Sequence, residues 1–309
     1  MKTPELLVTP TNTADILPLI QAGATAFLVG EQRYGLRLAG EFTREDIQTA
    51  VNIAHKEGAK VYAAVNGLFH NDKVAELGDY LAFLSEAGVD AAVFGDPAVL
   101  MAARESAPEL KLHWSTETTG TNYYTCNYWG RRGAVRAVLA KELNMDSIVE
   151  IKENAEVEIE IQVHGMTCMF QSKRSLVGNY FEYQGKVMDI EGKKKETGLF
   201  LHDKERDNKY PIFEDENGTH IMSPNDVCII DELEELIEAG VDSFKIDGVL
   251  KSSEYLIEVT RMYREAIDLC IENRDEYEDK KEGWIERIES LQPVNRSIDT
   301  GFFFKETVY

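Results

Sequence analysis

The 309-residue chain lacks any run close to the roughly 18 consecutive apolar residues that a membrane-spanning helix requires. Its start, Met1 to Glu5, runs directly into Leu6–Val8, without the charged beginning and long apolar stretch of a signal peptide. Cysteine is also scarce, and a core of this size does not need disulfides. The four cysteines are Cys126, Cys168, Cys228 and Cys270. We therefore expect a cytoplasmic protein that makes no membrane contact.

Positive charge is scarce as well. The sequence has 33 Lys and Arg against 55 Asp and Glu, which gives a formal net charge of −22. A protein that holds a nucleic acid on its own normally has a basic patch and a basic balance, so strong independent binding of RNA or DNA is not expected. No GxGxxG or P-loop follows an apolar run, and neither the HExxH nor the GxSxG motif occurs. These absences exclude common nucleotide-binding and hydrolase sites.

A unit of helix, glycine and strand recurs along the chain. It is clearest as IQAGATAFLVG (20–30), HKEGAKVYAAV (55–65), SEAGVDAAVFG (85–95) and IEAGVDSFKIDG (237–248). In each unit an amphipathic segment ends at a glycine where a helix C-cap needs a left-handed residue. These glycines are Gly23, Gly58, Gly88 and Gly240. Helix starts are marked too, for example by Thr43 ahead of 44–56.

The expected strands are short continuous apolar runs, which is typical of strands buried on both faces. Eight such runs that alternate with helices favour a closed (β/α)8 TIM-like barrel in the α/β class over an open sheet. They lie at 5–8, 26–29, 60–65, 91–94, 110–114, 135–139, 157–163 and 243–246.

The regular alternation breaks after the seventh strand, at about 165–222, where we predict an insertion of β-hairpins. The barrel with this insertion is placed in residues 1–250. Residues 251–309 are expected to form a C-terminal helical extension, with a helix over 252–272 that begins at Ser252, and a tail. The apolar run Phe302-Phe303-Phe304 predicts that the tail packs on the barrel or on a partner.

Side chains at the C-terminal ends of the strands form the active face in barrels of this type. Here these positions carry acids, amides, an imidazole and amines, which together can bind a small polar substrate and move protons. The candidate catalytic residues are Glu142, His164, Lys245 and Asp247. The candidate substrate-binding residues are Glu31, Asn66 and Glu117, and further polar strand-end residues are Asp96, Thr116 and Lys141. The alternative is that many of these side chains are helix caps or structural ion pairs.

Two cysteines are candidates for chemistry. Cys168 follows His164 by four residues, and together they can form a nucleophile and its base, which makes Cys168 a further catalytic candidate. Cys228 ends the segment SPNDVC (223–228), which we expect to open a helix capped by Asn225 or Asp226. Cys228 would then lie in the first helical turn, where the pKa of a thiol is lowered. The alternatives are that both are small buried hydrophobes, or that they meet in space across the insertion. Two sulfurs alone do not make a zinc or iron–sulfur site.

Several segments resemble peptidase family U32, the collagenase-like group of unassigned catalytic type. The resemblance covers most of the chain. It rests on 160–178 with Glu160, His164, Gly165 and Cys168, on SPNDVC (223–228), on DSFKIDGVLKS (242–252), on the stretch from Trp129 through Arg136 to Leu143, and on DTGF (299–302). The resemblance implies a barrel fold and adds Arg136 to the substrate-binding candidates. In many members it also implies an iron–sulfur cluster held by four cysteines.

The cluster signature is degenerate in this chain. Cys168 matches the first ligand position and Cys228 the last, but Ser175 stands at the second. The third position falls in 179–192, which contains no cysteine, and Lys173 and Gly178 also depart from the signature. We therefore expect no cofactor bound by this chain, with Cys168 and Cys228 as remnant cluster positions. The iron–sulfur cluster is expected in a partner, a longer four-cysteine paralogue.

The resemblance also implies a function. Some relatives carry out oxygen-independent hydroxylation, and one branch hydroxylates the wobble uridine of tRNA using prephenate. Short members resemble the smaller half of a pair encoded beside a longer paralogue. We therefore expect a subunit of a tRNA uridine 5-hydroxylation system that meets tRNA indirectly and binds a small acidic metabolite such as prephenate. The alternatives are a collagenase-like peptidase and a non-catalytic interaction subunit.

Overall fold

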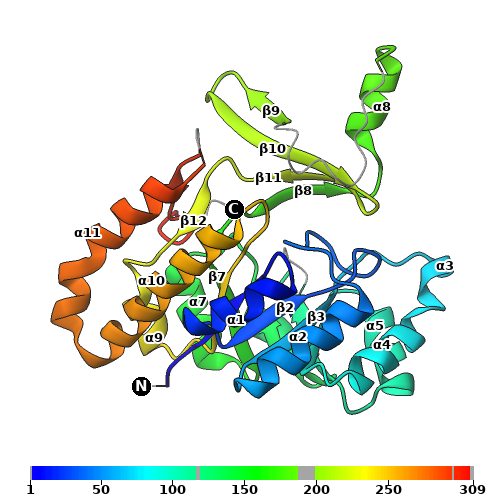
Figure 1. Ribbon diagram of the computed structural model, residues 1–309, viewed down its shortest axis with the longest axis horizontal. Helices are drawn as coiled ribbons and strands as arrows, with labels where there is room; N and C mark the ends of the chain where they lie inside the picture. The colour runs from blue at the N-terminus through cyan, green and yellow to red at the C-terminus, as the bar shows by residue number, and fades with distance from the viewer. Residues whose placement is uncertain (1, 116–118, 187–198, 294–295, 307–309) are drawn as a thin grey trace.

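Eight parallel strands close a barrel in the computed structural model, which describes residues 2–115, 119–186, 199–293 and 296–306 (Figure 1). β13 pairs with β1 on one side and with β7 on the other, so the ring is complete. The prediction of a (β/α)8 barrel is confirmed. In order around the ring, its strands are β1 (Glu5–Val8), β2 (Ala26–Val29), β3 (Lys60–Val65), β4 (Ala91–Phe94), β5 (Lys111–Ser115), β6 (Ala134–Val138), β7 (Glu158–Gly165) and β13 (Ser243–Ile246).

Helices cover the outside of the ring and bury the main hydrophobic core against it. In α2, Thr43 accepts a hydrogen bond from the backbone N–H of Asp46, as expected of a cap, and the apolar stripe of Ile47, Ala50, Val51 and Ala54 is buried. The four predicted C-cap glycines all have positive φ. Apart from α8 in the insertion, the described helices before β13 are η1 (Thr13–Asp15), α1 (Ile16–Gln21), α2 (Arg44–Lys56), α3 (Asn71–Val74), α4 (Leu77–Glu86), α5 (Pro97–Ser106), α6 (Tyr123–Gly130), α7 (Met145–Asn154) and α9 (Leu233–Glu238).

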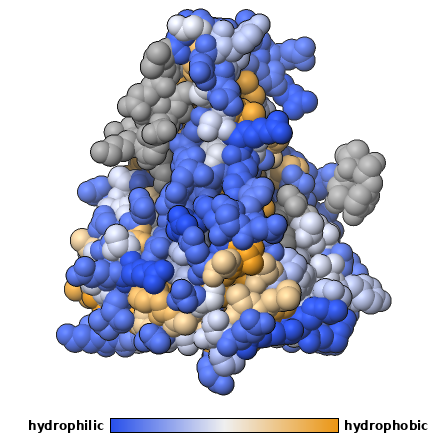
Figure 2. Space-filling model, turned by 90° about the vertical axis from the view of Figure 1, so that its right-hand side faces the viewer, coloured by the Kyte–Doolittle hydropathy of each residue, from blue (hydrophilic) through white to orange (hydrophobic). Residues whose placement is uncertain are grey.

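The insertion after β7 forms a four-stranded antiparallel sheet in the order β8-β11-β10-β9. It rises above the barrel in Figure 1 and forms the narrower upper part of the mainly hydrophilic face in Figure 2. Met166, Phe213, Met222 and Val249 form a small apolar cluster where the sheet meets the barrel. Its elements are β8 (Cys168–Ser172), α8 (Leu176–Tyr183), β9 (Phe200–Asp203), β10 (Asn208–Asp215) and β11 (Gly218–Met222). The predicted hairpins are present, whereas α8 was not predicted.

The C-terminal residues return to the barrel. α10 (Ser253–Glu272) begins after Ser252, whose hydroxyl accepts from the backbone N–H of Tyr255, and α11 (Arg274–Leu291) packs beside it. Phe303 is buried, and its carbonyl accepts a hydrogen bond from the backbone N–H of Met145. β14 (Ile298–Asp299) pairs with β12 (Asp226–Cys228). Among the residues that the structure describes, no helix has both the length and the apolar character needed to cross a bilayer.

The expectation of a helix starting at Asn225 or Asp226 is wrong. Residues 226–228 form β12, and the next helix, α9, begins only at Leu233. The run Val227-Cys228-Ile229-Ile230 is apolar and rich in β-branched residues, which favours buried extended structure. Asp226 is fully buried and paired with Lys251 and Arg296 instead of capping a helix.

Candidate functional site at the barrel mouth

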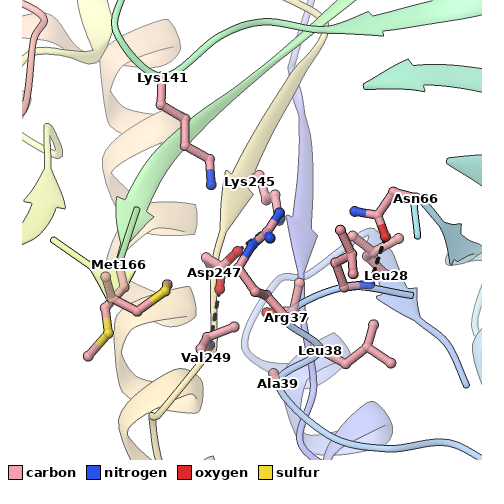
Figure 3. Close-up of a pocket in the computed structure, with 13 residues that line it drawn as sticks. Leu28, Arg37, Leu38, Ala39, Asn66, Lys141, Met166, Lys245, Asp247 and Val249 are labelled. Carbon is pink, nitrogen blue, oxygen red and sulfur yellow. Dashed lines mark hydrogen bonds and ion pairs between the residues drawn. The ribbon is translucent and has the colours of Figure 1, made fainter. Parts of the chain in front are cut away.

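A small hollow lies at the C-terminal ends of the barrel strands (Figure 3), and Met222 of the insertion strand β11 is among its lining residues. Its volume is about 30 Å³, enough for roughly two waters at the ~10–15 Å³ that each requires. Side chains from the ends of β1, β2, β3, β6, β7 and β13 contribute to it, together with the loop after β2. The lining residues are Thr9, Leu28, Leu36, Arg37, Leu38, Ala39, Asn66, Lys141, Met166, Met222, Lys245, Asp247 and Val249.

Three cations surround one carboxylate in this hollow. Lys245 Nζ lies 2.9 Å from Asp247 Oδ2, and Arg37 and Lys141 extend into the same space (Figure 3). The backbone N–H of Val249 donates to Asp247 Oδ1 at 3.0 Å. Burial acts to raise the pKa of Asp247, but the charges of Lys245 and Lys141 and the hydrogen bonds outweigh it, so that pKa is lowered. Among the described lining residues, three cations accompany one carboxylate, a balance that favours a small anion. We call these four residues the mouth cluster.

Arg37 is the member that strand-end reasoning missed. It lies several residues beyond β2 and has φ of 52°, a left-handed conformation that is uncommon for arginine. The loop is tied to the neighbouring strand end, because the backbone N–H of Leu36 donates to Asn66 Oδ1 at 2.9 Å. Figure 3 shows the amide nitrogen of Asn66 on the side facing Arg37 and Lys245. A search for basic residues in the loops after predicted strands could have found Arg37.

The structure places the predicted strand-end residues in different surroundings. Asn66, Lys245 and Asp247 come together in the hollow. Glu142 is exposed in the loop after β6 and is not among the lining residues. Glu31 accepts a hydrogen bond from Arg44 at 3.3 Å, and burial raises its pKa. Glu117 and Thr116 lie outside the described residues.

Arg136 lies inside the barrel, well below the mouth. Its guanidinium is 2 % exposed and contacts three carboxylates, Glu5 at 2.6 Å, Glu158 at 2.8 Å and Glu160 at 3.2 Å. Tyr62 adds a hydrogen bond to Glu5 at 2.7 Å. A buried charge that is paired in this way is typical of a structural network. Removing one partner from such a network lowers the free energy of unfolding strongly. The structure therefore does not bring Arg136 to the candidate site.

His164 faces the outer helices and not the barrel mouth. Its Nε2 lies 2.7 Å from the hydroxyl of Tyr255, and its Nδ1 lies 3.4 Å from that of Tyr263; both tyrosines belong to α10. The ring is fully buried, and this burial lowers the pKa of His164 to about 3. Cys168 is half-buried on β8, where its thiol contacts the carbonyl of Phe170 at 3.4 Å. Both ring nitrogens of His164 therefore face tyrosine hydroxyls rather than a thiol.

The cysteines do not fit a four-thiolate cluster. Cys228 is buried in β12, not in a helical turn, and burial raises the pKa of its thiol to about 12. Cys126 and Cys270 lie on α6 and α10, where burial raises each thiol pKa to about 11. Cluster ligands are thiolates, which such surroundings disfavour. In the described ranges, no three His, Cys, Asp or Glu side chains are grouped as metal ligands.

Known proteins are similar to this chain over most or all of its length. A sequence profile of peptidase family U32 matches residues 11–308. The chain is 90% identical to tRNA hydroxylation protein P2 of Bacillus subtilis (strain 168), over 100% of both chains. tRNA hydroxylation protein P1 of the same strain is 33% identical over 98% of this chain and 71% of its own length. tRNA hydroxylation protein P of Escherichia coli (strain K12) is 33% identical over 86% of this chain and 68% of its own length.

Proposed function

This chain belongs to peptidase family U32, and we propose that it is a subunit of a system that 5-hydroxylates the wobble uridine of tRNA. The observation that carries the proposal is the 90% identity, over the full length of both chains, to a protein named for tRNA hydroxylation. The peptidase alternative receives no support from the geometry, because both ring nitrogens of His164 face the hydroxyls of Tyr255 and Tyr263.

The mouth cluster supports a role in binding a small organic acid. Guanidinium and ammonium groups are the usual partners of carboxylates, and their charge-assisted hydrogen bonds are stronger than neutral ones. The volume of about 30 Å³ accommodates a carboxylate but not a whole metabolite. We propose that one carboxylate of an acid such as prephenate enters between Arg37, Lys141 and Lys245, while the rest of the molecule stays above the hollow. Asp247 holds Lys245 in place through their 2.9 Å contact.

A partner would supply the redox cofactor. The proposed partner is a longer paralogue of the kind represented by tRNA hydroxylation protein P1, which extends beyond the region matched by this chain. We propose that this paralogue holds an iron–sulfur cluster, since the thiols of the present chain do not fit one. In this arrangement the present chain binds and orients the small acid, and the cluster-bearing partner carries out the redox step.

Deleting the gene in its native host tests the proposal. Mass spectrometry of digested tRNA should show a loss of 5-hydroxyuridine and the nucleosides derived from it, restored by a plasmid copy. Anaerobic purification of the tagged chain should bring down the longer paralogue, with iron found only in the fraction that contains both proteins. An unchanged tRNA profile in the deletion strain would exclude the proposed function.

A further inference from the structure

The insertion sheet has an apolar face that points away from the barrel. On its barrel side, Phe213 packs with Met166 and Val249 in the small cluster at the junction. Because side chains alternate along a strand, the preceding residue, Ile212, lies on the opposite side of the sheet. Cross-strand pairing places one residue of β11 and one of β8 beside it, and together they form the row Ile212, Ile221 and Phe170. We call this row the outer row, and the side of the sheet that carries it the outer face.

The outer face is more apolar than the free side of an antiparallel sheet normally is. A sheet with one side on a core usually presents polar side chains on the other. Here Phe170 is 48 % exposed, and Leu201, which pairs with Tyr210 on the same face, is 52 % exposed. Fifteen large hydrophobic side chains are exposed among the described residues, and seven of them belong to the insertion, which is about one seventh of that part of the chain. Exposed apolar side chains that gather in this way mark a contact with another surface.

The charge of the insertion differs from that of the rest of the chain. Residues 168–222 contain nine Lys or Arg and ten Asp or Glu, so only −1 of the net charge of −22 belongs to them. Two copies that met through their barrels would bring two strongly acidic bodies together, which Coulomb repulsion opposes. Two insertions can meet near neutrality, and because the insertion rises above the barrel (Figure 1), the acidic bodies then stay apart. The insertion is therefore the part of this chain that suits contact with a second copy.

The outer face is also complementary to itself. A two-fold dimer uses the same patch on both copies, so the patch must match its own charges and shape. The outer row carries no charge, and the β9–β10 hairpin beside it alternates three acids with three bases over residues 203–209. Two facing sheets pack about 10 Å apart, with the side chains of both in one layer. We propose that two copies of this chain associate face to face through the outer row, with each Phe170 packed on the sheet of the other copy.

The oligomeric state of the purified full chain tests this proposal, which goes beyond the proposed function and does not rest on it. Sedimentation velocity over about 1 to 100 µM protein should show the mass rising from one chain to two. Phe170→Glu should weaken the dimer at least about thirtyfold, because it places a charge at the centre of an apolar contact. Leu201→Glu, on the same face, should weaken it as well. Thermal unfolding checks that each variant is folded, and Leu201→Glu decides the matter if Phe170→Glu is not.

Phe200→Glu is the matched control. Phe200 is 49 % exposed and precedes Leu201 on β9, so its exposure equals that of Phe170 while its side chain points to the opposite side of the sheet. Its pairing with Pro211, the neighbour of Ile212, agrees with this direction. The dissociation constant of the dimer should therefore be unchanged in Phe200→Glu.

Salt separates an apolar contact from one held by ion pairs. Raising NaCl from about 50 to 500 mM screens the repulsion between the two acidic bodies, so the dimer should become tighter. A dimer that becomes weaker with added salt would overturn the proposal, because it would be held by ion pairs.

Two other results would overturn the proposal: a monomer at every concentration and salt, or equal weakening by Phe170→Glu and Phe200→Glu. A chain that is monomeric alone but binds the longer paralogue, and loses it in Phe170→Glu, would assign the outer face to that paralogue in place of a second copy. The tRNA profile of the deletion strain does not enter these measurements, so the dimer can fail while the proposed function stands.

Discussion

At the scale of single residues, a register shift between two barrel strands sets the surroundings of His164. Alternation along β7 would place His164 on the interior face that carries Glu160 and Gln162. The pairing of β7 with β13 instead shifts register, because Lys245 is opposite Gln162 whereas Ile246 is opposite His164. This irregularity turns His164 outward with Ile246, into the helix-facing core. No sequence pattern marks such a shift, so the face on which His164 lies could not be predicted.

The cysteines give a prediction about reactivity. Cys126, Cys228 and Cys270 are buried, and burial raises each thiol pKa to about 11 or 12, whereas Cys168 is only half-buried. Because the thiolate is the reactive species, alkylation of the folded protein with iodoacetamide at pH 8 should modify Cys168 first. Peptide mass spectrometry over a time course measures this order. Modification of Cys228 as fast as Cys168 would contradict the buried position of Cys228.

His164 gives a prediction about pH. Its pKa is about 3 in the folded chain against 6.5 without burial, so between pH 6.5 and pH 3 the proton binds to the unfolded chain but not to the folded one. The stability contributed by neutral His164 is therefore complete above pH 6.5 and is lost as the pH falls from 6.5 towards 3, by about 1.4 kcal/mol per pH unit. Urea unfolding at pH 7.5 and 5.5 should show a smaller decrease for His164→Gln than for the wild type. The exposed control His70→Gln should behave as wild type, and identical decreases in all three would contradict the prediction.

At the scale of elements, local sequence patterns were enough to predict the strands and the helices α2 and α10. The two helices begin where predicted, because Thr43 and Ser252 form the expected caps. α8 could not be predicted in this way, since its eight residues include Gly178 and Ser175 before it provides no side-chain cap. Its first turn depends on Glu214 of β10, whose carboxylate accepts from the backbone N–H groups of Val177 and Gly178. A helix held by a residue so distant in sequence is not visible in a local pattern.

The turn after β7 gives a prediction at this scale. Gly165 has φ of 103°, and a Cβ there would lie 2.4 Å from the carbonyl oxygen of Asp247. Gly58 also has positive φ, but a Cβ added there meets no atom within 4 Å. Gly58→Ala should therefore cost about 1–2 kcal/mol of backbone strain. Gly165→Ala should lower the free energy of unfolding further than Gly58→Ala does, because the turn that carries Asp247 must also move. Thermal unfolding of both variants measures the difference, and equal decreases in Tm would contradict it.

At the scale of the whole molecule, the barrel could be predicted because eight apolar runs at regular spacing leave few arrangements that bury all of them. The hollow at its mouth could be predicted only in part. Asn66 and Asp247 come directly after predicted strands and Lys141 two residues after one, while Arg37 enters from a loop whose path depends on Asn66. The net charge of −22 gave no indication that positive charge gathers at one place, because composition does not record position.

We propose that the positive mouth of this barrel serves tRNA uridine hydroxylation. The test complements the deletion strain with a plasmid copy of the gene that carries Lys141→Met. The amount of 5-hydroxyuridine-derived nucleosides in its tRNA is then measured. We predict that the amount of these nucleosides decreases about tenfold or more while the protein level is unchanged. This is the effect of losing one charge-assisted hydrogen bond. Lys111→Met, an equal loss of charge at the opposite end of the barrel, should restore modification fully. Full restoration of the tRNA modification by Lys141→Met as well would contradict this role of the mouth cluster.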